Sequence, residues 1–207
     1  MILAPVILAS VILAIDISTA TGSLALTRAG YLLEEFLLEA QTGYGEIIFA
    51  AIDGLLKRHA IAIQQVELIA VAQGPGTFTG VRMGLTLAQG LAEALSRPVC
   101  GISNLAALAH TGQGPRRAPV LDARRGQHYT AVYSAEGTLI EPERLQNLED
   151  FHPGVSLLHQ TGPLAAAIAA LAQYAVPQDP SALDANYIRR TDAELNLTVR
   201  PPSSPRK

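Results

Sequence analysis

The stretch VELIAVAQGPGTFTGVRMG, residues 66–84, runs from an apolar segment through a glycine-rich turn into the start of a helix. Its first part, VELIAVAQ, has the length and aliphatic content of a buried strand. Four glycines and a proline between Gly74 and Gly84 then predict a sharp turn. A helix is expected over residues 79–95, with Thr77 or Thr79 accepting a hydrogen bond from one of its free N–H groups. A strand, a turn and a helix in this order are typical of α/β proteins.

A glycine-rich turn after a strand can also hold phosphate, and its spacing decides between the two uses. A Walker-type loop, GxxxxGK[ST], that begins at Gly76 would need a glycine at Val81 and a lysine at Arg82. Begun at Gly74, the same motif needs a glycine where Thr79 stands, and so does the dinucleotide motif GxGxxG. The turn is therefore expected to shape the chain more than to cradle phosphate.

The composition excludes several classes of protein. The chain has 207 residues, of which 49% are hydrophobic and 16% charged, as in a compact globular protein. Its net charge of −3 gives no overall attraction to nucleic acid or to an anionic membrane. The single cysteine, Cys100, excludes an internal disulfide and fits a reducing cytoplasm; because it stands in an apolar strand, we expect it in the core.

The chain is expected to divide into two lobes. We expect residues 1–10 to be an atypical leader, because the second of two VILA repeats is expected to be a buried strand. The apolar run of residues 1–15 is too short to span a membrane and lacks the positive charges of a signal peptide. Strands and helices then alternate over residues 11–112, the N-terminal lobe, with helices at residues 44–59 and 79–95. Residues 113–199 form the C-terminal lobe, and residues 200–207, rich in Pro and Ser, a disordered tail.

Each lobe is expected to begin with a similar unit. A buried strand ends at Asp16 in one and at Asp122 in the other, and two further strands follow each aspartate after turns. The spacings from Asp16 to Gly30 and from Asp122 to Gly137 differ by one residue. The pattern indicates two similar lobes, and two unrelated hairpins with a turn-forming aspartate remain the alternative.

The two expected helices are more apolar than one sheet face requires, which indicates burial by a second chain. In the helix of residues 79–95, small residues also recur at every fourth position and predict the close approach of another element. The residues expected at a partner interface are Ile47, Ile48, Ala51, Ile52, Leu55, Gly80, Val81, Gly84, Leu85 and Ala88. Alternatively, both helices are buried inside this chain's own lobe.

Four segments, ILAIDISTATGSLAL, ELIAVAQGPGTFTGVRMGLTLAQGLAEAL, PVCGISNLAALA and PVLDARRGQHYTAVY, closely resemble the TsaB (YeaZ) family. Its members are bacterial partner proteins in threonylcarbamoyladenosine modification of tRNA. The resemblance runs from about residue 11 to residue 135, and NYIRR at residues 186–190 echoes a further family feature. It implies an α/β, two-lobed actin/Hsp70/sugar-kinase-like (ASKHA) fold with mixed sheets and helices packed on them.

The resemblance also implies a vestigial nucleotide site. Asp16, Ser18 and Thr19 hold the positions that face nucleotide phosphates and a metal in that superfamily. Where active members have a glycine-rich second turn, this chain has Arg124 and Arg125, whose side chains would crowd a phosphate. The catalytic paralogue of this family, TsaD, carries an HxxxH metal motif. No metal site is expected here, because no two of the histidines are four residues apart. No catalytic residue is expected either. The chain would need no cofactor of its own, with ATP and Mg²⁺ possible in the partner or at the complex interface.

The resemblance implies a non-catalytic scaffold or activating subunit that pairs with the TsaD-type paralogue through residues 44–59 and 79–95. A TsaE-type ATPase would be a further partner, tRNA would be reached only through the complex, and no membrane is involved. Arginine pairs at residues 116–117, 124–125 and 189–190 are either tRNA contacts or ordinary surface. Two alternatives remain: an independent ATPase or small-molecule kinase that uses Asp16 as metal anchor, and a homodimer through the same helices.

Overall fold

The structure is a computed structural model that describes residues 11–39, 43–150 and 154–188. The expected leader (residues 1–10), the expected tail (residues 200–207) and the arginine pair at residues 189–190 lie outside the described residues. Among the described helices, none is long and apolar enough to cross a membrane.

The first lobe is built on a five-stranded mixed sheet with the strand order β3-β2-β1-β4-β5. Its strands are β1 (Val11–Asp16), β2 (Gly22–Arg28), β3 (Tyr31–Leu38), β4 (Val66–Gly74) and β5 (Val99–Ser103). β1 pairs antiparallel with β2 and parallel with β4, and all six of its residues are buried. The expected central strand is confirmed, because an aliphatic segment buried on both faces can only lie inside such a sheet.

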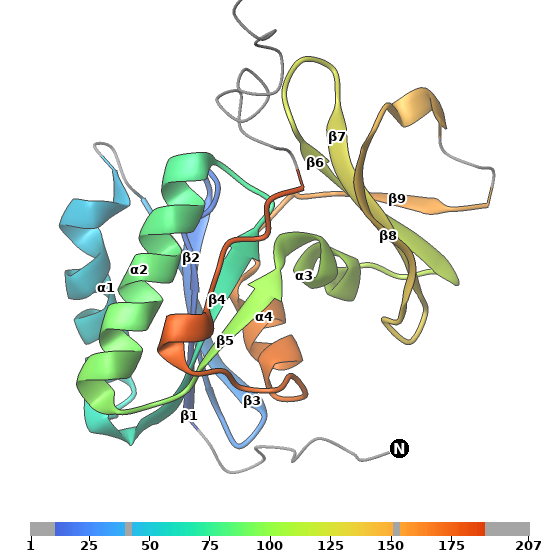
Figure 1. Cartoon of the computed structure of the whole chain (residues 1–207). Coiled ribbons are helices and arrows are strands. Elements are labelled where there is room, and N and C mark those ends of the chain that lie inside the picture. The colour runs from blue at the N-terminus through green and yellow to red at the C-terminus, as the bar shows by residue number, and fades with distance from the viewer. Residues whose placement is uncertain (1–10, 40–42, 151–153, 189–207) are drawn as a thin grey trace, which may run out of the picture.

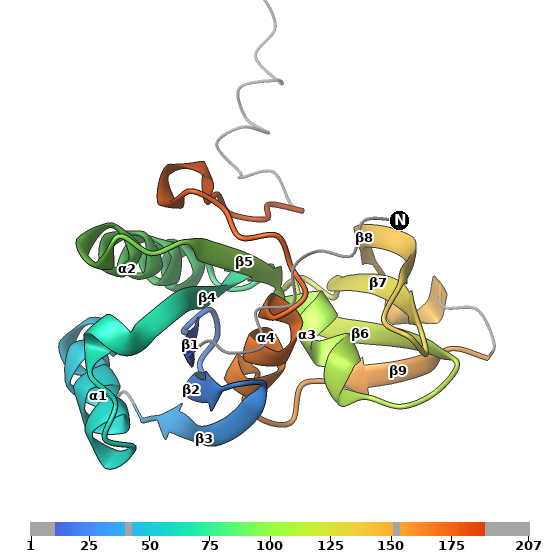
Figure 2. The same cartoon turned by 90° about the horizontal axis from the view of Figure 1, so that it is seen from below.

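Helices cover both faces of this sheet (Figure 1 and Figure 2). The side chains of β1 alternate in direction, so Leu13 and Ile15 pack with α1 (Tyr44–Arg58) and α2 (Phe78–Leu95). Ile12 and Ala14 pack on the other face with α3 (Asn104–Thr111) and α4 (Ala165–Ala172). α1 and α2 therefore lie side by side on one face, where no further described α-helix covers them, although the short 3₁₀ helix Pro180–Ala182 contacts α2.

The second lobe is a four-stranded sheet with the order β8-β7-β6-β9. Its strands are β6 (Arg116–Asp122), β7 (His128–Ser134), β8 (Leu139–Gln146) and β9 (Ser156–His159). Short 3₁₀ turns lie at Ile63–Gln65, Leu148–Asp150 and Pro180–Ala182. β6 pairs antiparallel with β7 and parallel with β9, so the expected similarity of the two strand–aspartate–hairpin units extends to their pairing. α3 lies between the two sheets.

The last described part of the chain returns to the first lobe, so the second lobe ends before α4 and does not extend over the expected residues 113–199. α4 packs on the first sheet, and its first N–H groups are held there. Ala165 N–H donates to Ser23 Oγ (3.2 Å) and Ala166 N–H to Glu35 Oε1 (2.8 Å). The two lobes are therefore spatial units, and only the second is continuous in sequence.

Candidate functional site

Backbone N–H groups of the glycine-rich turn between β4 and α2 donate hydrogen bonds to other groups of the protein. Thr77 is the N-cap of α2, and its Oγ1 accepts from Gly80 N–H (3.2 Å). Thr77 N–H donates to the Ser18 carbonyl (2.7 Å), and Gly74 N–H donates to Asn104 Oδ1 (3.0 Å). The expected helix cap is confirmed, with Thr77 rather than Thr79 as the capping residue.

The glycines of this segment let α2 approach the end of β1. A Cβ atom on Gly76 would lie 2.7 Å from the Ser18 carbonyl oxygen, and one on Gly80 would press into the Ile17 carbonyl. A Cβ atom on Gly84 would lie 3.3 Å from the Ile17 side chain. The close approach predicted from the small-residue stripe is real, but the approaching element belongs to the same chain.

Asp16 is buried next to the contact between α2 and the end of β1. Its side chain has no exposed surface, and its Oδ1 accepts from Ser18 N–H (3.0 Å) and Ser18 Oγ–H (2.6 Å). Asn104 Nδ2 donates to Ser18 Oγ (2.6 Å), whereas Asp16 Oδ2 has no hydrogen-bond partner. Burial is the main cause that raises the pKa of Asp16. Of the three residues expected at a nucleotide site, only Thr19 lines the cleft described next.

A cleft of about 810 Å³ lies between the lobes. From the first lobe it is lined by Thr19, Ala20, Pro75, Gly76, Thr77, Phe78 and Val81. The second lobe contributes Val120, Leu121, Asp122, Ala123, Arg124, Arg125, Tyr129, His159 and Gln160, and the C-terminal segment contributes Asn186, Tyr187 and Ile188. The two Asp-turn units thus meet here, one through Thr19 and Ala20 and the other through residues 122–125.

The turn of the second lobe is held in a left-handed conformation. Arg124 and Arg125 have φ angles of 66° and 58°, and Gly126 follows with 77°. A non-glycine residue costs roughly 1–2 kcal/mol in this region, because its Cβ crowds the backbone. Asp122 Oδ1 accepts from Arg124 N–H (2.7 Å) and stabilises the turn. The arginines stand where the resemblance implied a glycine-rich turn, and they line the cleft.

A second cavity, the groove between α1 and α2, measures about 780 Å³. It is lined by Gly45, Ile48, Phe49, Phe78, Thr79, Arg82, Met83, Thr86, Leu87, Gly90, Leu91 and Ala94. These side chains are mostly apolar, and Phe49 is 63% exposed. The groove is the open apolar face that the sequence predicted for these two helices.

The residues expected at the partner interface, however, lie mostly on the opposite side of the helices. Those that are buried in this chain are Ile48, Ile52, Leu55, Gly80, Val81, Gly84, Leu85 and Ala88, whereas Ile47 and Ala51 are partly exposed. Only Ile48 among the ten lines the groove. The small and branched residues pack against the sheet, which leaves the longer side chains of the other face to form the open surface.

An exposed arginine–aromatic cluster closes the groove at the start of α2. The Arg82 guanidinium carbon lies 3.9 Å from the Phe78 ring centroid, and Arg82 Nε donates to Tyr187 Oη (2.7 Å). The Phe78 and Tyr187 rings are stacked, 6.2 Å apart. Phe78 therefore lines both the groove and the cleft, with Tyr187 beside it on the cleft side.

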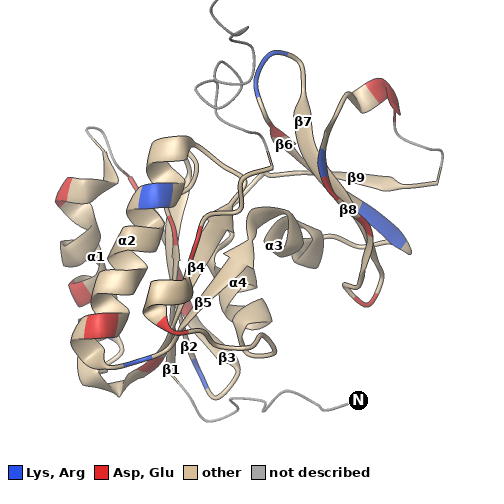
Figure 3. Cartoon of the chain, in the orientation of Figure 1, with Lys and Arg blue, Asp and Glu red and all other residues tan. Residues whose placement is uncertain are grey.

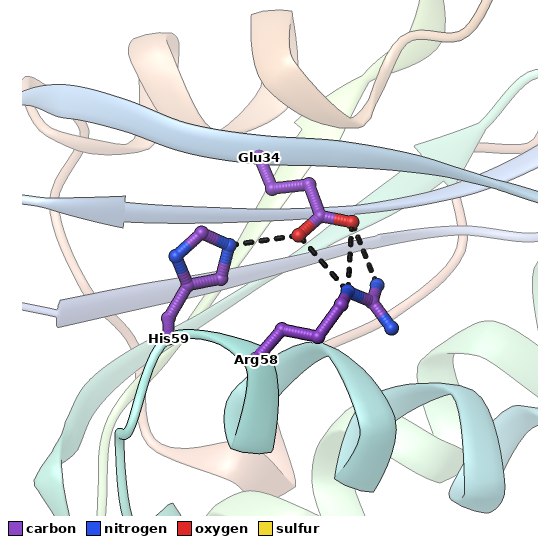
Figure 4. A network of polar contacts seen from close by, with 3 residues as sticks. All are labelled: Glu34, Arg58 and His59. Atoms are coloured by element: carbon purple, nitrogen blue, oxygen red, sulfur yellow. Dashed lines mark hydrogen bonds and ion pairs between the residues drawn. The ribbon is translucent and has the colours of Figure 1, made fainter.

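An ionic contact fixes the far end of α1 to the edge strand β3 (Figure 4). Glu34 accepts from Arg58 Nη2 (2.6 Å) and from His59 Nε2 (2.8 Å). Its hydrogen bond with Arg58 is the main cause that lowers the pKa of Glu34. The contact positions α1, which forms one wall of the groove.

Other residues singled out from the sequence have structural surroundings. Cys100 is buried, which raises the pKa of its thiol to about 11 and confirms it as a core residue. Arg116 pairs with Glu141, and the buried Arg117 donates to the Ser134 carbonyl. Within the described ranges, no group of three or more His, Cys, Asp or Glu side chains is placed to hold a metal ion.

Three residues at these sites carried no sequence signal that we recognised. Asn104 joins the glycine-rich turn to Ser18, and Tyr44 Oη donates to the carbonyls of Thr19 (3.0 Å) and Ala20 (2.7 Å). Glu143 accepts from Ser103 of the first lobe and from Asn186 Nδ2 (2.5 Å). Each is a contact between segments far apart in sequence, which local spacing cannot show.

The paired sheets, with their matching strand–aspartate–hairpin units and the cleft between them, define a two-lobed actin/Hsp70/sugar-kinase-like (ASKHA) protein. A family model described as TsaD, tRNA N6-adenosine threonylcarbamoyltransferase, matches residues 38–187. The solved structure of YeaZ from Pseudomonas aeruginosa superposes with a TM-score of 0.76 at 28% identity, over 86% of this chain and 99% of that one.

Curated relatives agree with this match. Proteins named tRNA threonylcarbamoyladenosine biosynthesis protein TsaB, from Bacillus subtilis and Escherichia coli, are 39% and 33% identical over 132 and 129 residues. The alignments cover 63% and 60% of this chain but 58% and 55% of the relatives, so the chain spans about half the length of the curated relatives it matches. The chain belongs to this family, among its TsaB (YeaZ) members.

Proposed function

We propose that this protein serves threonylcarbamoyladenosine formation on tRNA as a non-catalytic subunit that docks a TsaD-type paralogue. The observation that carries the proposal is the open apolar groove between α1 and α2, about 780 Å³ in volume. Apolar grooves of this kind on a helix pair are typical docking surfaces. The names of the TsaB relatives supply the pathway.

The residue composition of the groove resembles that of a protein–protein interface. Apolar side chains, the exposed Phe49 and Phe78 among them, form most of its lining, and Arg82 stands at its end. Aromatic and arginine side chains dominate the binding energy of many interfaces, because they bury a large area at a small entropic cost. Arg82 is also held against Phe78 and Tyr187, so little of its freedom remains to be lost on docking.

A TsaD-type protein is the occupant that the comparisons favour. The TsaD family model matches residues 38–187, a range that includes both helices of the groove. A paralogue of this fold would present a similar helix pair, and two similar pairs can pack on each other across a pseudo-twofold axis as a four-helix bundle. A homodimer through the same groove would form when the chain is alone, and a TsaE-type ATPase would join the pair.

The sealed state of Asp16 supports a subunit role over an independent ATPase or kinase. Oδ1 of Asp16 is held by Ser18, and neither residue lines the cleft. A carboxylate must reach a hydrated cation to anchor a nucleotide–metal complex. The chain would then require no cofactor of its own, and ATP and Mg²⁺ would act in the partner or at the interface; tRNA would be bound through the complex.

Light scattering on a sizing column, with the chain alone and mixed with the TsaD-type paralogue of the same organism, tests the proposal. We expect a one-to-one complex that outcompetes any homodimer. Phe49→Glu should weaken it about thirtyfold or more, because truncating a central aromatic residue typically costs about 2 kcal/mol. The matched control is Leu37→Glu on β3, 49% exposed and outside the groove, which should bind normally.

Two results would overturn the proposal. One is the absence of any complex with or without ATP and the TsaE-type ATPase; the other is normal tRNA modification by the Phe49→Glu variant. ATP hydrolysis by the isolated chain that is lost in Asp16→Ala would instead establish the independent-enzyme alternative.

A further inference from the structure

The segment that follows α4, residues 173–188, runs along the first lobe and ends between the lobes (Figure 1). Gln178 exchanges backbone hydrogen bonds with Val99 of β5, and the Leu183 side chain is buried in the core of the first lobe. The last three described residues of the segment line the cleft. They open the NYIRR stretch of residues 186–190, to which the proposed docking assigns no role.

A carboxylate of the second lobe holds the end of this segment. Glu143 on β8 accepts from Asn186 Nδ2 through one oxygen (2.5 Å). Its other oxygen accepts from Tyr133 Oη (3.3 Å) and from Ser103 Oγ, at the end of β5. Burial is the main cause that raises the pKa of Tyr133, so the phenol keeps the proton that it donates. One side chain thus joins the second lobe to the first lobe and to the C-terminal segment.

The residue after Asn186 reaches the groove between α1 and α2. Tyr187 Oη accepts from Arg82 Nε (2.7 Å), and the Tyr187 ring stacks on Phe78. Arg82 and Phe78 both line the groove, and the blue band near the start of α2 in Figure 3 marks Arg82, the one Lys or Arg of this helix. All residues that line the groove belong to α1 and α2. The second lobe therefore reaches the groove through the C-terminal segment.

We propose that Asn186 is a positioning residue through which Glu143 of the second lobe fixes the end of the docking groove. Held by Glu143, Asn186 keeps Tyr187 against Arg82 and Phe78. An arginine that is ordered before docking loses less conformational freedom when a partner binds, so the contact strengthens docking from outside the groove. This effect on docking rests on the proposed function, whereas the link between Glu143 and Arg82 is a property of the chain alone.

The NMR signal of the Arg82 Nε–H group tests the link in the full chain without a partner, and its loss in Arg82→Lys assigns it. In Asn186→Asp a second carboxylate faces Glu143, and repulsion between like charges should move the end of the segment. We expect the signal to shift and its exchange with water to become about fivefold faster, because the hydrogen bond to Tyr187 is weakened. Asn186 N–H donates to the Gln73 carbonyl (2.9 Å), which keeps the segment on β4 in this variant.

Exchanging the two groups, Glu143→Gln with Asn186→Asp, should restore the signal. The amide introduced at position 143 keeps an oxygen for Ser103 and Tyr133, and its NH₂ group donates to the carboxylate introduced at position 186. Rescue by the double variant separates this pairwise contact from a general loss of stability. The matched control is Asn147→Asp, an exposed asparagine of the second lobe outside both cavities, which adds the same charge and should leave the signal unchanged.

Titration with the TsaD-type paralogue measures docking by the same variants. Asn186→Asp should weaken the complex about fivefold, and the double variant should bind as wild type does. An Arg82 signal that Asn186→Asp leaves unchanged, or that the double variant fails to restore, would overturn the link. Normal docking by Asn186→Asp would refute Asn186 as a positioning residue of the groove. No complex with wild type would instead overturn the proposed docking, and the Arg82 signal would still decide whether the link exists.

Discussion

The two aspartate turns occupy equivalent places in the two sheets and have opposite surroundings. Each aspartate ends a strand and accepts a hydrogen bond from the N–H group two residues further on, at 3.0 Å for Asp16 and 2.7 Å for Asp122. Asp16 has no exposed surface, whereas Asp122 is exposed and lines the cleft. The same aspartate turn is thus buried in the first lobe and exposed at the wall of the cleft in the second.

The difference comes from what packs on each turn. Gly76 in the turn before α2 and Gly80 in its first turn lie against Ile17 and Ser18, and Asn104 donates to Ser18. The second turn instead carries Arg124 and Arg125 into the cleft. Packing therefore keeps Asp16 and Ser18 out of the cleft, whereas Asp122 remains on its wall.

The largest loss of stability is expected at Gly80, where α2 packs most closely on the turn after β1. In Gly80→Ala, the new methyl group would press into the Ile17 carbonyl and against the capping hydroxyl of Thr77. Backbone cannot yield as a flexible side chain can, so the free energy of unfolding should fall by about 3 kcal/mol. Urea unfolding followed by circular dichroism measures this change.

Gly90→Ala is the matched control in the same helix. No atom lies within 4 Å of a Cβ built on Gly90, and alanine is the better helix former, so this variant should gain up to about 1 kcal/mol. Equal effects of the two substitutions would show that helix propensity, and not contact with the Ile17 carbonyl, decides the cost at Gly80.

Local signals in the sequence predicted much of this comparison. The strand that ends at Asp16, the hairpin after Asp122 and the cap at Thr77 all depend on neighbouring residues, and all three are found as expected. α3 and α4 were missed, although the alanine- and leucine-rich segment of α4 has strong helix formers. Its first N–H groups are held by Ser23 and Glu35, which no spacing along the chain reveals.

Neighbouring residues in the sequence could not show which face of α1 and α2 packs on the sheet and which face stays open. Gly80, Gly84 and Ala88 predict a close contact but not with which element, and the two glycines contact Ile17, directly after β1 of this chain. The open side is formed by residues such as Phe49 and Leu91. Deciding between the two faces requires the position of the sheet, which is a property of the whole fold.

The stability of the protein as a function of pH tests whether Asp16 is buried as the comparison of the two turns requires. Burial raises the pKa of Asp16 in the folded protein above its ordinary value of 3.8, so folding favours the protonated form. Its contribution to stability is complete below pH 3.8 and is lost as the pH rises from there through the folded pKa. Wild type should therefore lose stability relative to Asp16→Asn over this window, by up to about 1.4 kcal/mol per pH unit.

Urea unfolding of both proteins at each pH gives the difference directly. Comparing the two cancels carboxylates such as Glu34, whose lowered pKa acts in the opposite direction with pH. A difference that stays constant from acidic to neutral pH would mean that the Asp16 carboxyl is not desolvated by the fold.

The smallest effect is expected at Asp122. Asp122→Ala removes one exposed hydrogen bond, from Arg124 N–H, and should lower the free energy of unfolding by about 1 kcal/mol or less. Thermal unfolding measures this change. A loss of stability as large as that of Gly80→Ala would show that the second turn is as tightly built into its lobe as the first, and that the two differ only in exposure.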